Sequence, residues 1–453
     1  MSRIHGAAAG GLLLAFAVPH PARAQFLPAA TRDDPLALVA VADRMAGQNL
    51  WPGFDARTIP VAVFDGERTF LFRHPAPPPG FLPLPGVAGV FTMQGRADEI
   101  TANSSSTIGG VRTATLMPPS AVTPLRSRAG VLIHEAFHVF QREHHKAWSA
   151  NEAELFTYPF SDTAQISMQR EELEALRRAL LASRTEGACW AKVAMDVRSR
   201  RLAMLPRGAA QFERATELNE GLATYVEKRA VGVVDRNVLS EARFAPDMVR
   251  SRAYQSGVAI GRLLDRYSPR WRSILENNDS TALDALLGTA LSPRPRSSCG
   301  FSSSERAKFE AQSAVDVAAL VTRREQARRE FLGKDGWSVS IVSPESPLFP
   351  QGFDPLNVQM VTAGEVLHTR FVKLGNDAGT IQVLGRASLT EAAGAHPLFN
   401  GVKRLTVAGL STAPDIKIRG DTITVSAEGV SGEFRRAAVL REDRRVTVTL
   451  SRE

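Results

Sequence analysis

The chain of 453 residues is poor in the features that define several protein classes. Its two cysteines are too few for a disulfide-dense scaffold and too far apart for a local Cys-x-x-Cys site. No apolar run reaches the roughly 20 residues that a transmembrane helix needs, so we expect no stable membrane insertion. Lysine and arginine form no tract, and the net charge of +8 therefore indicates a basic, solvated surface rather than a nucleic-acid interface. The content of 44% hydrophobic and 23% charged residues is typical of folded domains with real cores.

The first residues have the pattern of an export signal. Arg3 precedes an apolar stretch of small residues over 6–18, and Ala22-Arg23-Ala24 forms an A-x-A cleavage site. The sequence therefore predicts a signal peptide over 1–24 and a mature, exported chain that starts near Gln25, in the periplasm or outside the cell.

The two cysteines are Cys189 and Cys299. Export places them in an oxidising compartment, where an intrachain disulfide between them is the favoured interpretation. Two buried free thiols are the alternative that the sequence leaves open.

Hydrophobic periodicity and turn residues predict an early β region followed by helices. A helix over 35–47 comes first, then two strands, 58–65 and 68–73, joined by a hairpin at Asp65-Gly66. A proline-rich loop over 75–85 follows, and further strands are expected at 87–93 and 112–116. The predicted helices cover 128–146, 167–183, 190–205, 211–230, 253–267 and 304–332.

From Trp337 onward, β-branched runs alternate with glycine and Asn/Asp turns, which predicts an all-β C-terminal domain of sandwich or barrel type. The predicted fold class is α+β. We expect a first domain over 25–303 with an N-terminal sheet and a mainly helical part, a connecting helix over 304–336 and the β domain over 337–453.

The segment His134-Glu135-Ala136-Phe137-His138 is an H-E-x-x-H motif between apolar residues on both sides. Residues i and i+4 lie on one face of a helix, so His134 and His138 can bind one metal ion. Glu135 lies one residue after His134, next to the helix face that carries both histidines, where its carboxylate can hold a water molecule and act as general base. Two imidazoles suit zinc, and we expect one Zn²⁺ per chain.

A catalytic zinc site needs a third protein ligand. No H-x-x-G-x-x-H continuation follows the motif, so an acid further along the chain must supply it. Glu217 and Glu220 lie at i and i+3 of an apolar-striped helix, so either can face the metal helix while the other hydrogen-bonds the ligands.

Together, HEAFH and the segment NEGLATYVE over 219–227 resemble the gluzincin metallopeptidases, distantly the aminopeptidase N type. In that family the glutamate before the glycine ligates zinc, so the resemblance implies a zincin-like catalytic domain with Glu220 as third ligand. It also implies a tyrosine that stabilises the oxyanion at a Y-x-x-G helix start, which matches Tyr254 to Gly257 here.

The chain departs from the family in two ways. Glu220 follows His138 by 82 residues, much further than in the family, so an insertion separates the two metal helices. The G-x-M-E-N motif that anchors a substrate amino terminus is absent, and aminopeptidase specificity is therefore not implied.

These patterns predict an exported zinc metallopeptidase that hydrolyses a peptide or protein substrate. Glu135 and Tyr254 are the expected catalytic residues, and an extended substrate is expected to add to the edge of the N-terminal sheet. A non-catalytic binding protein on a zincin scaffold and a zinc amidase acting on cell-wall peptides are the alternatives.

Overall fold

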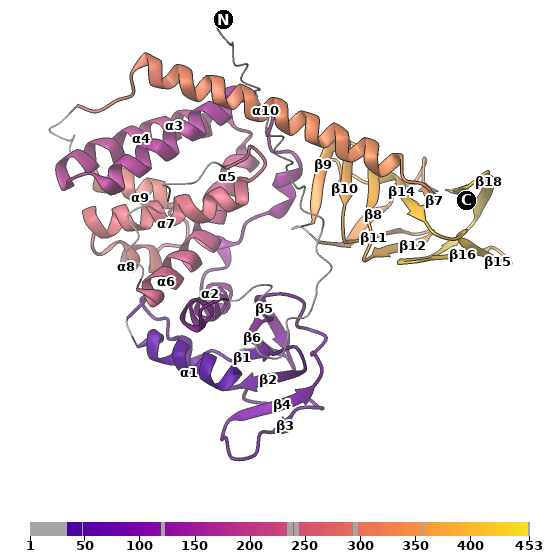
Figure 1. Cartoon of the computed structure of the whole chain (residues 1–453), viewed down its shortest axis with the longest axis horizontal. Coiled ribbons are helices and arrows are strands. Elements are labelled where there is room, and N and C mark those ends of the chain that lie inside the picture. The colour runs from indigo at the N-terminus through magenta and orange to yellow at the C-terminus, as the bar shows by residue number, and fades with distance from the viewer. Residues whose placement is uncertain are drawn as a thin grey trace, which may run out of the picture. The chain divides into compact units, whose positions relative to one another are not determined.

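The structure, a computed structural model, describes residues 34–47, 49–118, 123–232, 239, 244–292, 298–354 and 357–451. The predicted signal peptide over 1–24 lies outside the described residues. The described chain forms two compact units (Figure 1): residues 34–47 and 56–139 belong to the first, and residues 49–55 and 140–451 to the second. The class is α+β with a β-rich C-terminal region, as the sequence predicted.

The first unit contains helix α1 and a six-stranded sheet in the order β3-β4-β2-β1-β6-β5. Asp34 caps α1 by accepting a hydrogen bond from the backbone NH of Leu36, so the predicted helix start is confirmed. Strands β1 and β2 pair antiparallel around Asp65-Gly66, which confirms the predicted hairpin. The element bounds are α1 (Pro35–Ala46), the 3-10 turn η2 (Ala56–Thr58), β1 (Val61–Phe64), β2 (Arg68–Phe72), β3 (Leu82–Pro83), β4 (Val90–Gln94), β5 (Ser104–Ile108) and β6 (Val111–Leu116).

Two strands of this sheet differ from the prediction. Strand β3 lies inside the proline-rich stretch assigned to a loop, and it pairs with β4 over only two residues. Strand β5, at the sheet edge, is absent from the prediction because its sequence, SSSTI, has little apolar character. Its hairpin to β6 turns through Gly109 and Gly110, both at positive φ.

Helix α2 (Leu125–His144) is continuous and carries the HEAFH motif. Its residues up to Val139 belong to the first unit and those from Phe140 to the second. The predicted range of 128–146 was right to within three residues at each end.

The second unit begins with short turns and a layer of helices. The helix predicted over 211–230 is confirmed, and it contains a π-helical turn, η5, between its α-helical parts α5 and α6, which the prediction did not include. The bounds are η3 (Lys146–Trp148), η4 (Glu152–Phe156), α3 (Thr163–Leu181), α4 (Arg184–Met204), α5 (Arg207–Thr216), η5 (Glu217–Gly221), α6 (Leu222–Val231), α7 (Val249–Tyr267), α8 (Trp271–Glu276) and α9 (Leu283–Ala290).

A buried ion network joins these helices. Arg198 of α4 contacts Glu172 of α3 at 2.7 Å and Glu217 of η5 at 2.5 Å. Arg201, one turn further, contacts Glu172 at 2.8 Å and Glu213 of α5 at 2.7 Å. Burial opposes ionisation of these acids, but Arg201 and Arg198 lower the pKa of Glu172 below its usual value. The network therefore fixes the segment that leads into η5.

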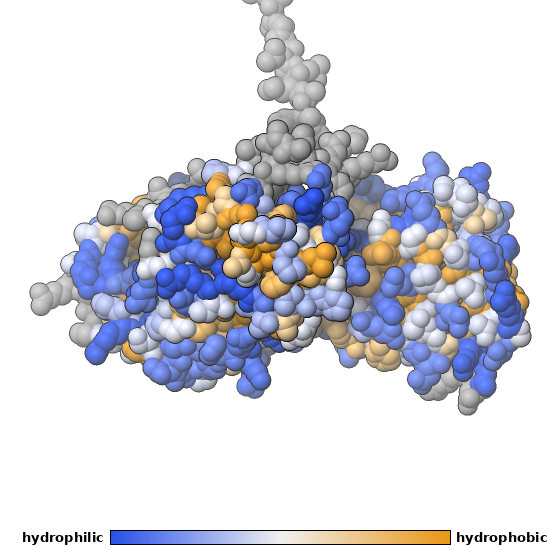
Figure 2. All heavy atoms as spheres, turned by 90° about the horizontal axis from the view of Figure 1, so that it is seen from below, coloured by the Kyte–Doolittle hydropathy of each residue, from blue (hydrophilic) through white to orange (hydrophobic). Residues whose placement is uncertain are grey.

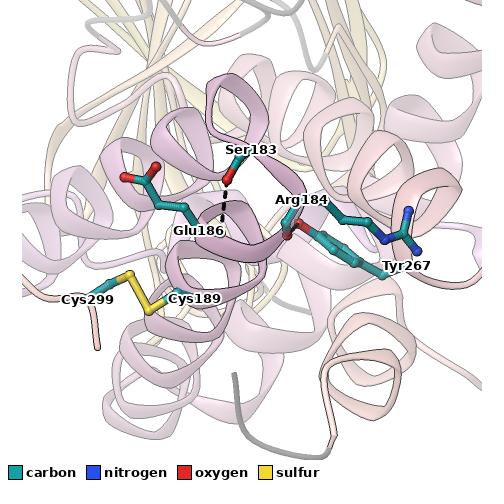
Figure 3. The surroundings of a disulfide bond; sticks show 6 residues. All are labelled: Ser183, Arg184, Glu186, Cys189, Tyr267 and Cys299. Carbon is teal, nitrogen blue, oxygen red and sulfur yellow. Dashed lines mark hydrogen bonds between the residues drawn. A yellow bond between two sulfur atoms is a disulfide. The ribbon is translucent and has the colours of Figure 1, made fainter. Parts of the chain in front are cut away.

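Helix α10 (Ser303–Leu332) connects the helical layer with the β-rich region (Figure 1). Ser302 and Glu305 form a capping box at its start. Just before it, Cys299 forms a disulfide with Cys189 of α4, with the Cα atoms 5.8 Å apart (Figure 3). The predicted pairing is thus confirmed in the structure, and it fixes the start of α10 against α4.

The C-terminal region contains a seven-stranded sheet, β18-β19-β7-β14-β13-β10-β9, and a six-stranded sheet, β15-β16-β17-β12-β11-β8. Buried side chains from both sheets form one apolar core, as expected for a sandwich. The strands are β7 (Trp337–Val342), β8 (Phe349–Phe353), β9 (Val358–Thr362), β10 (Glu365–His368), β11 (Phe371–Asn376), β12 (Gly379–Leu384), β13 (Ser388–Ala392), β14 (Val402–Leu410), β15 (Asp415–Arg419), β16 (Thr422–Ala427), β17 (Val430–Arg435), β18 (Ala437–Glu442) and β19 (Arg445–Leu450).

The surface drawn in Figure 2 is mixed: blue hydrophilic side chains are interspersed with smaller orange hydrophobic patches. Within the described part of the chain, every helix is too short or too polar to cross a membrane.

Candidate metal centre

Helix α2 holds both histidines of the motif on one face. The Nε2 atoms of His134 and His138 lie 3.0 Å apart, and the ring planes are nearly perpendicular. Both side chains are only 8% exposed, because the flanking residues Leu132, Ile133 and Val139 are buried as core. The apolar frame of the motif therefore explains why these imidazoles are held inside rather than solvated.

The π-helical turn η5 is fixed by the last turn of α2. The side-chain amide of Gln141 donates to two backbone carbonyls of this turn, those of Leu218 and Asn219, both at 2.9 Å. Gln141 lies three residues after His138, and therefore one turn further along the same helix face. This contact ties the histidine face of α2 to the segment that carries Glu220.

Glu220 joins the two histidines in one group. Each of His134, His138 and Glu220 offers a ligand atom within 4.8 Å of the others, and the Glu220 side chain is buried as well. The group could hold a metal ion. Two imidazole nitrogens and one carboxylate are the His₂Glu donor set of catalytic zinc sites. Two nitrogen ligands of a tetrahedral zinc ion, each at a Zn–N distance of ~2.0–2.1 Å, lie about 3.3 Å from one another. The 3.0 Å nitrogen separation fits that geometry.

The Glu220 carboxylate has two further partners, both on α7. Arg250 donates to its Oε1 at 2.6 Å, and the Tyr254 hydroxyl also hydrogen-bonds to the carboxylate. Burial, followed by the negative charge of Glu220, raises the pKa of Tyr254 above its usual value, so this phenol stays protonated as a donor. Tyr254 is thus next to the proposed ligand Glu220, but it lies inside α7, which begins at Val249, and not at a helix start as the Y-x-x-G match implied. Arg250 orients the same carboxylate.

Glu217, the other candidate ligand, is occupied elsewhere. Its carboxylate accepts hydrogen bonds from Arg198 and from the Ser256 hydroxyl, and it is fully buried. Burial raises the pKa of Glu217 to about 7, against the opposing charge of Arg198. The three-residue group contains Glu220 and not Glu217.

Glu135 is buried in α2, with 7% of its surface exposed, one residue after His134. A carboxylate buried at this point of an H-E-x-x-H helix is suited to accept a proton rather than to solvate the surface.

Two residues of this centre escaped the sequence analysis. Gln141 lies seven residues, or two helical turns, after His134 on the same helix face, a signal that could have singled it out. Arg250 carries no such signal, because it lies 30 residues after Glu220 and its role depends on how α7 crosses η5. The crossing is close: a Cβ on Gly257 would come within 2.7 Å of the Gly221 Cα.

Comparison with protein-family models, curated proteins and solved structures produced no match to this chain.

Proposed function

We propose that this protein is an exported zinc-dependent metallopeptidase of the gluzincin type. The observation that carries the proposal is the grouping of Glu220 with the two histidines of an H-E-x-x-H motif 82 residues before it. The disulfide between Cys189 and Cys299 supports export, because such bonds persist in oxidising compartments.

Each residue of the centre has a separate role in metal binding or catalysis. His134, His138 and Glu220 would hold the zinc, which supplies Lewis-acid polarisation of the scissile carbonyl and lowers the pKa of water. Glu135 takes the proton of the attacking water and gives it to the leaving nitrogen. Tyr254 would turn its single hydroxyl proton from the Glu220 carboxylate, once Glu220 holds the metal, to a hydrogen bond with the developing oxyanion. Arg250 keeps the Glu220 carboxylate oriented and offsets its charge.

Cleavage of a peptide library by the wild type and by Glu135→Gln tests the proposal. The variant should retain zinc and lose activity by about 10²–10⁴-fold, since it loses only the general base. Glu143→Gln is the matched control, because Glu143 is exposed on the same helix, and it should cleave like the wild type. Equal cleavage by Glu135→Gln and the wild type would contradict the mechanism. Zinc binding without any cleavage by the wild type would favour the non-catalytic alternative.

A further inference from the structure

A cavity of about 250 Å³ lies between the helices of the second unit and strand β9 of the C-terminal region. One wall comes from η4, one from the first turn of α7 and the residues before it, one from α10 and one from β9. The wall is largely apolar, and its apolar side chains are Leu155, Phe156, Phe160, Met248, Val358 and Met360. The C-terminal β region thus contributes directly to a binding cavity.

The side chain of Arg250 links this cavity to the proposed zinc ligand. Arg250 lines the cavity, and its guanidinium donates both to Glu220 at 2.6 Å and to Glu152. A molecule in the cavity would therefore lie next to the residue that orients Glu220. This closeness makes the cavity a natural place for part of a substrate.

The cavity also contains a cation without an anionic partner. Arg324 of α10 lies over the Phe160 ring, with 5.1 Å between its guanidinium carbon and the ring centroid. Its Nε is buried without a hydrogen-bond partner, and within the described chain it forms no ion pair. Asp247, the acid whose charge acts on Arg324, is held by Arg323 at 3.0 Å. A desolvated guanidinium of this kind favours a carboxylate ligand strongly.

The position of Arg324 in α10 determines which way its side chain points. Arg328, one turn further along α10, contacts Glu365 of β10 at 2.6 Å. Residues four apart share a helix face, so Arg324 also lies on the face of α10 that meets the β region. Arg328 is paired there, whereas Arg324 is left for a ligand.

We propose that this cavity is a substrate subsite for a large apolar residue that carries a carboxylate, with Arg324 as the residue that selects the carboxylate. The apolar walls take the side chain and the guanidinium binds the acid group, which is either the C-terminal carboxylate of a peptide or a neighbouring acidic side chain. The proposal rests on the proposed peptidase function and names the class of substrate that it would accept.

Calorimetric titration of the full chain with three small ligands tests this subsite. N-acetylphenylalanine carries the α-carboxylate, N-acetylphenylalanine amide lacks it, and N-acetyl-glutamyl-phenylalanine amide carries only a side-chain carboxylate. A charge-assisted hydrogen bond predicts that a carboxylate ligand binds about tenfold or more tightly than the neutral amide. Preference for the first or for the third ligand identifies the source of the carboxylate.

Variants of α10 decide whether Arg324 is responsible. Arg324→Met should reduce the carboxylate preference to less than about twofold, and Arg324→Lys should keep part of it because the charge remains. Arg329→Met is the matched control on the same helix, since Arg329 is 66% exposed, and it should bind like the wild type. Equal affinity for acid and amide in the wild type, or an undiminished preference in Arg324→Met, would overturn the proposal.

Running the titrations on zinc-loaded and on chelator-treated protein separates this proposal from the peptidase proposal. If the metal centre is wrong, the protein holds no zinc while the Arg324-dependent preference persists. If the subsite is wrong, zinc is bound and the preference is absent.

Discussion

The crossing of η5 and α7 depends on two facing glycines, and Gly257→Ala perturbs it directly. A Cβ on Gly257 would lie 2.7 Å from the Cα of Gly221 and 3.1 Å from the carbonyl oxygen of Glu217. Carbon atoms pack favourably at about 3.5–4.0 Å, so the two helices must separate by about 1 Å. Overpacking of this kind typically costs about 1–3 kcal/mol.

The separation should affect function as well as stability. Helix α7 carries Tyr254 and Arg250, and η5 carries Glu220, which they contact. A displacement of ~1 Å in a reacting centre can lower the rate by about 10²-fold. We therefore expect Gly257→Ala to unfold at a lower temperature, bind zinc more weakly in competition with a chromophoric chelator and turn over more slowly.

Gly288→Ala is the matched control for this experiment. Gly288 lies in α9, and a Cβ there meets no atom within 4 Å. Alanine exceeds glycine in helix propensity by about 1 kcal/mol, so this variant should be as stable as the wild type or slightly more so. A Gly257→Ala variant that matches the wild type in unfolding temperature and in zinc affinity would show that the helix crossing does not depend on these glycines.

Four further predictions follow from single residues. Tyr254→Phe should keep its zinc but lower kcat by about 10²–10³-fold, measured on a cleaved peptide; unchanged kcat would remove Tyr254 from the mechanism. Replacing Cys189 with serine opens a loop of 110 residues and should reduce the free energy of unfolding by about 2–5 kcal/mol, measured by denaturant titration; an unchanged midpoint would contradict this. Arg201→Met removes one arginine partner from each of the buried carboxylates of Glu172 and Glu213, and it should cost about 3–5 kcal/mol, whereas the exposed Arg200→Met should cost little; equal unfolding midpoints for the two would argue against the network. Burial lowers the pKa of His368 to about 4, so between pH 6.5 and pH 4 the unfolded chain binds more protons than the folded chain. The free energy of unfolding should therefore fall by roughly 3 kcal/mol as the pH is lowered through this range. His368→Gln should show a shallower pH dependence of its unfolding midpoint than the wild type.

Much of the fold could be predicted because the patterns are local. The hairpin at Asp65-Gly66, the capped start of α1 and the apolar frame around His134 and His138 each depend on residues close in sequence. The disulfide could be predicted because the chain has only two cysteines, Cys189 and Cys299, and therefore one possible pair. Strand β5 was missed because serine and threonine give little hydrophobic signal, although the Gly109-Gly110 turn after it was a usable cue.

The details of the metal centre depend on contacts between distant segments. The π turn within the predicted helix has two carbonyls that accept hydrogen bonds from Gln141, which lies almost 80 residues earlier. The choice between Glu217 and Glu220 depends on Arg198, which holds the first, and on Arg250, which holds the second. No periodicity within one helix reports such partners, so the resemblance to a family, rather than spacing, pointed to Glu220.

The zinc content of the mature protein, purified without chelators, tests the central claim most directly. The account predicts about one zinc ion per chain, retained in Glu143→Gln and lost or greatly weakened in Glu220→Ala. Absence of zinc from the wild type even after reconstitution, or full zinc content in Glu220→Ala, would contradict the assignment of His134, His138 and Glu220 as the metal ligands.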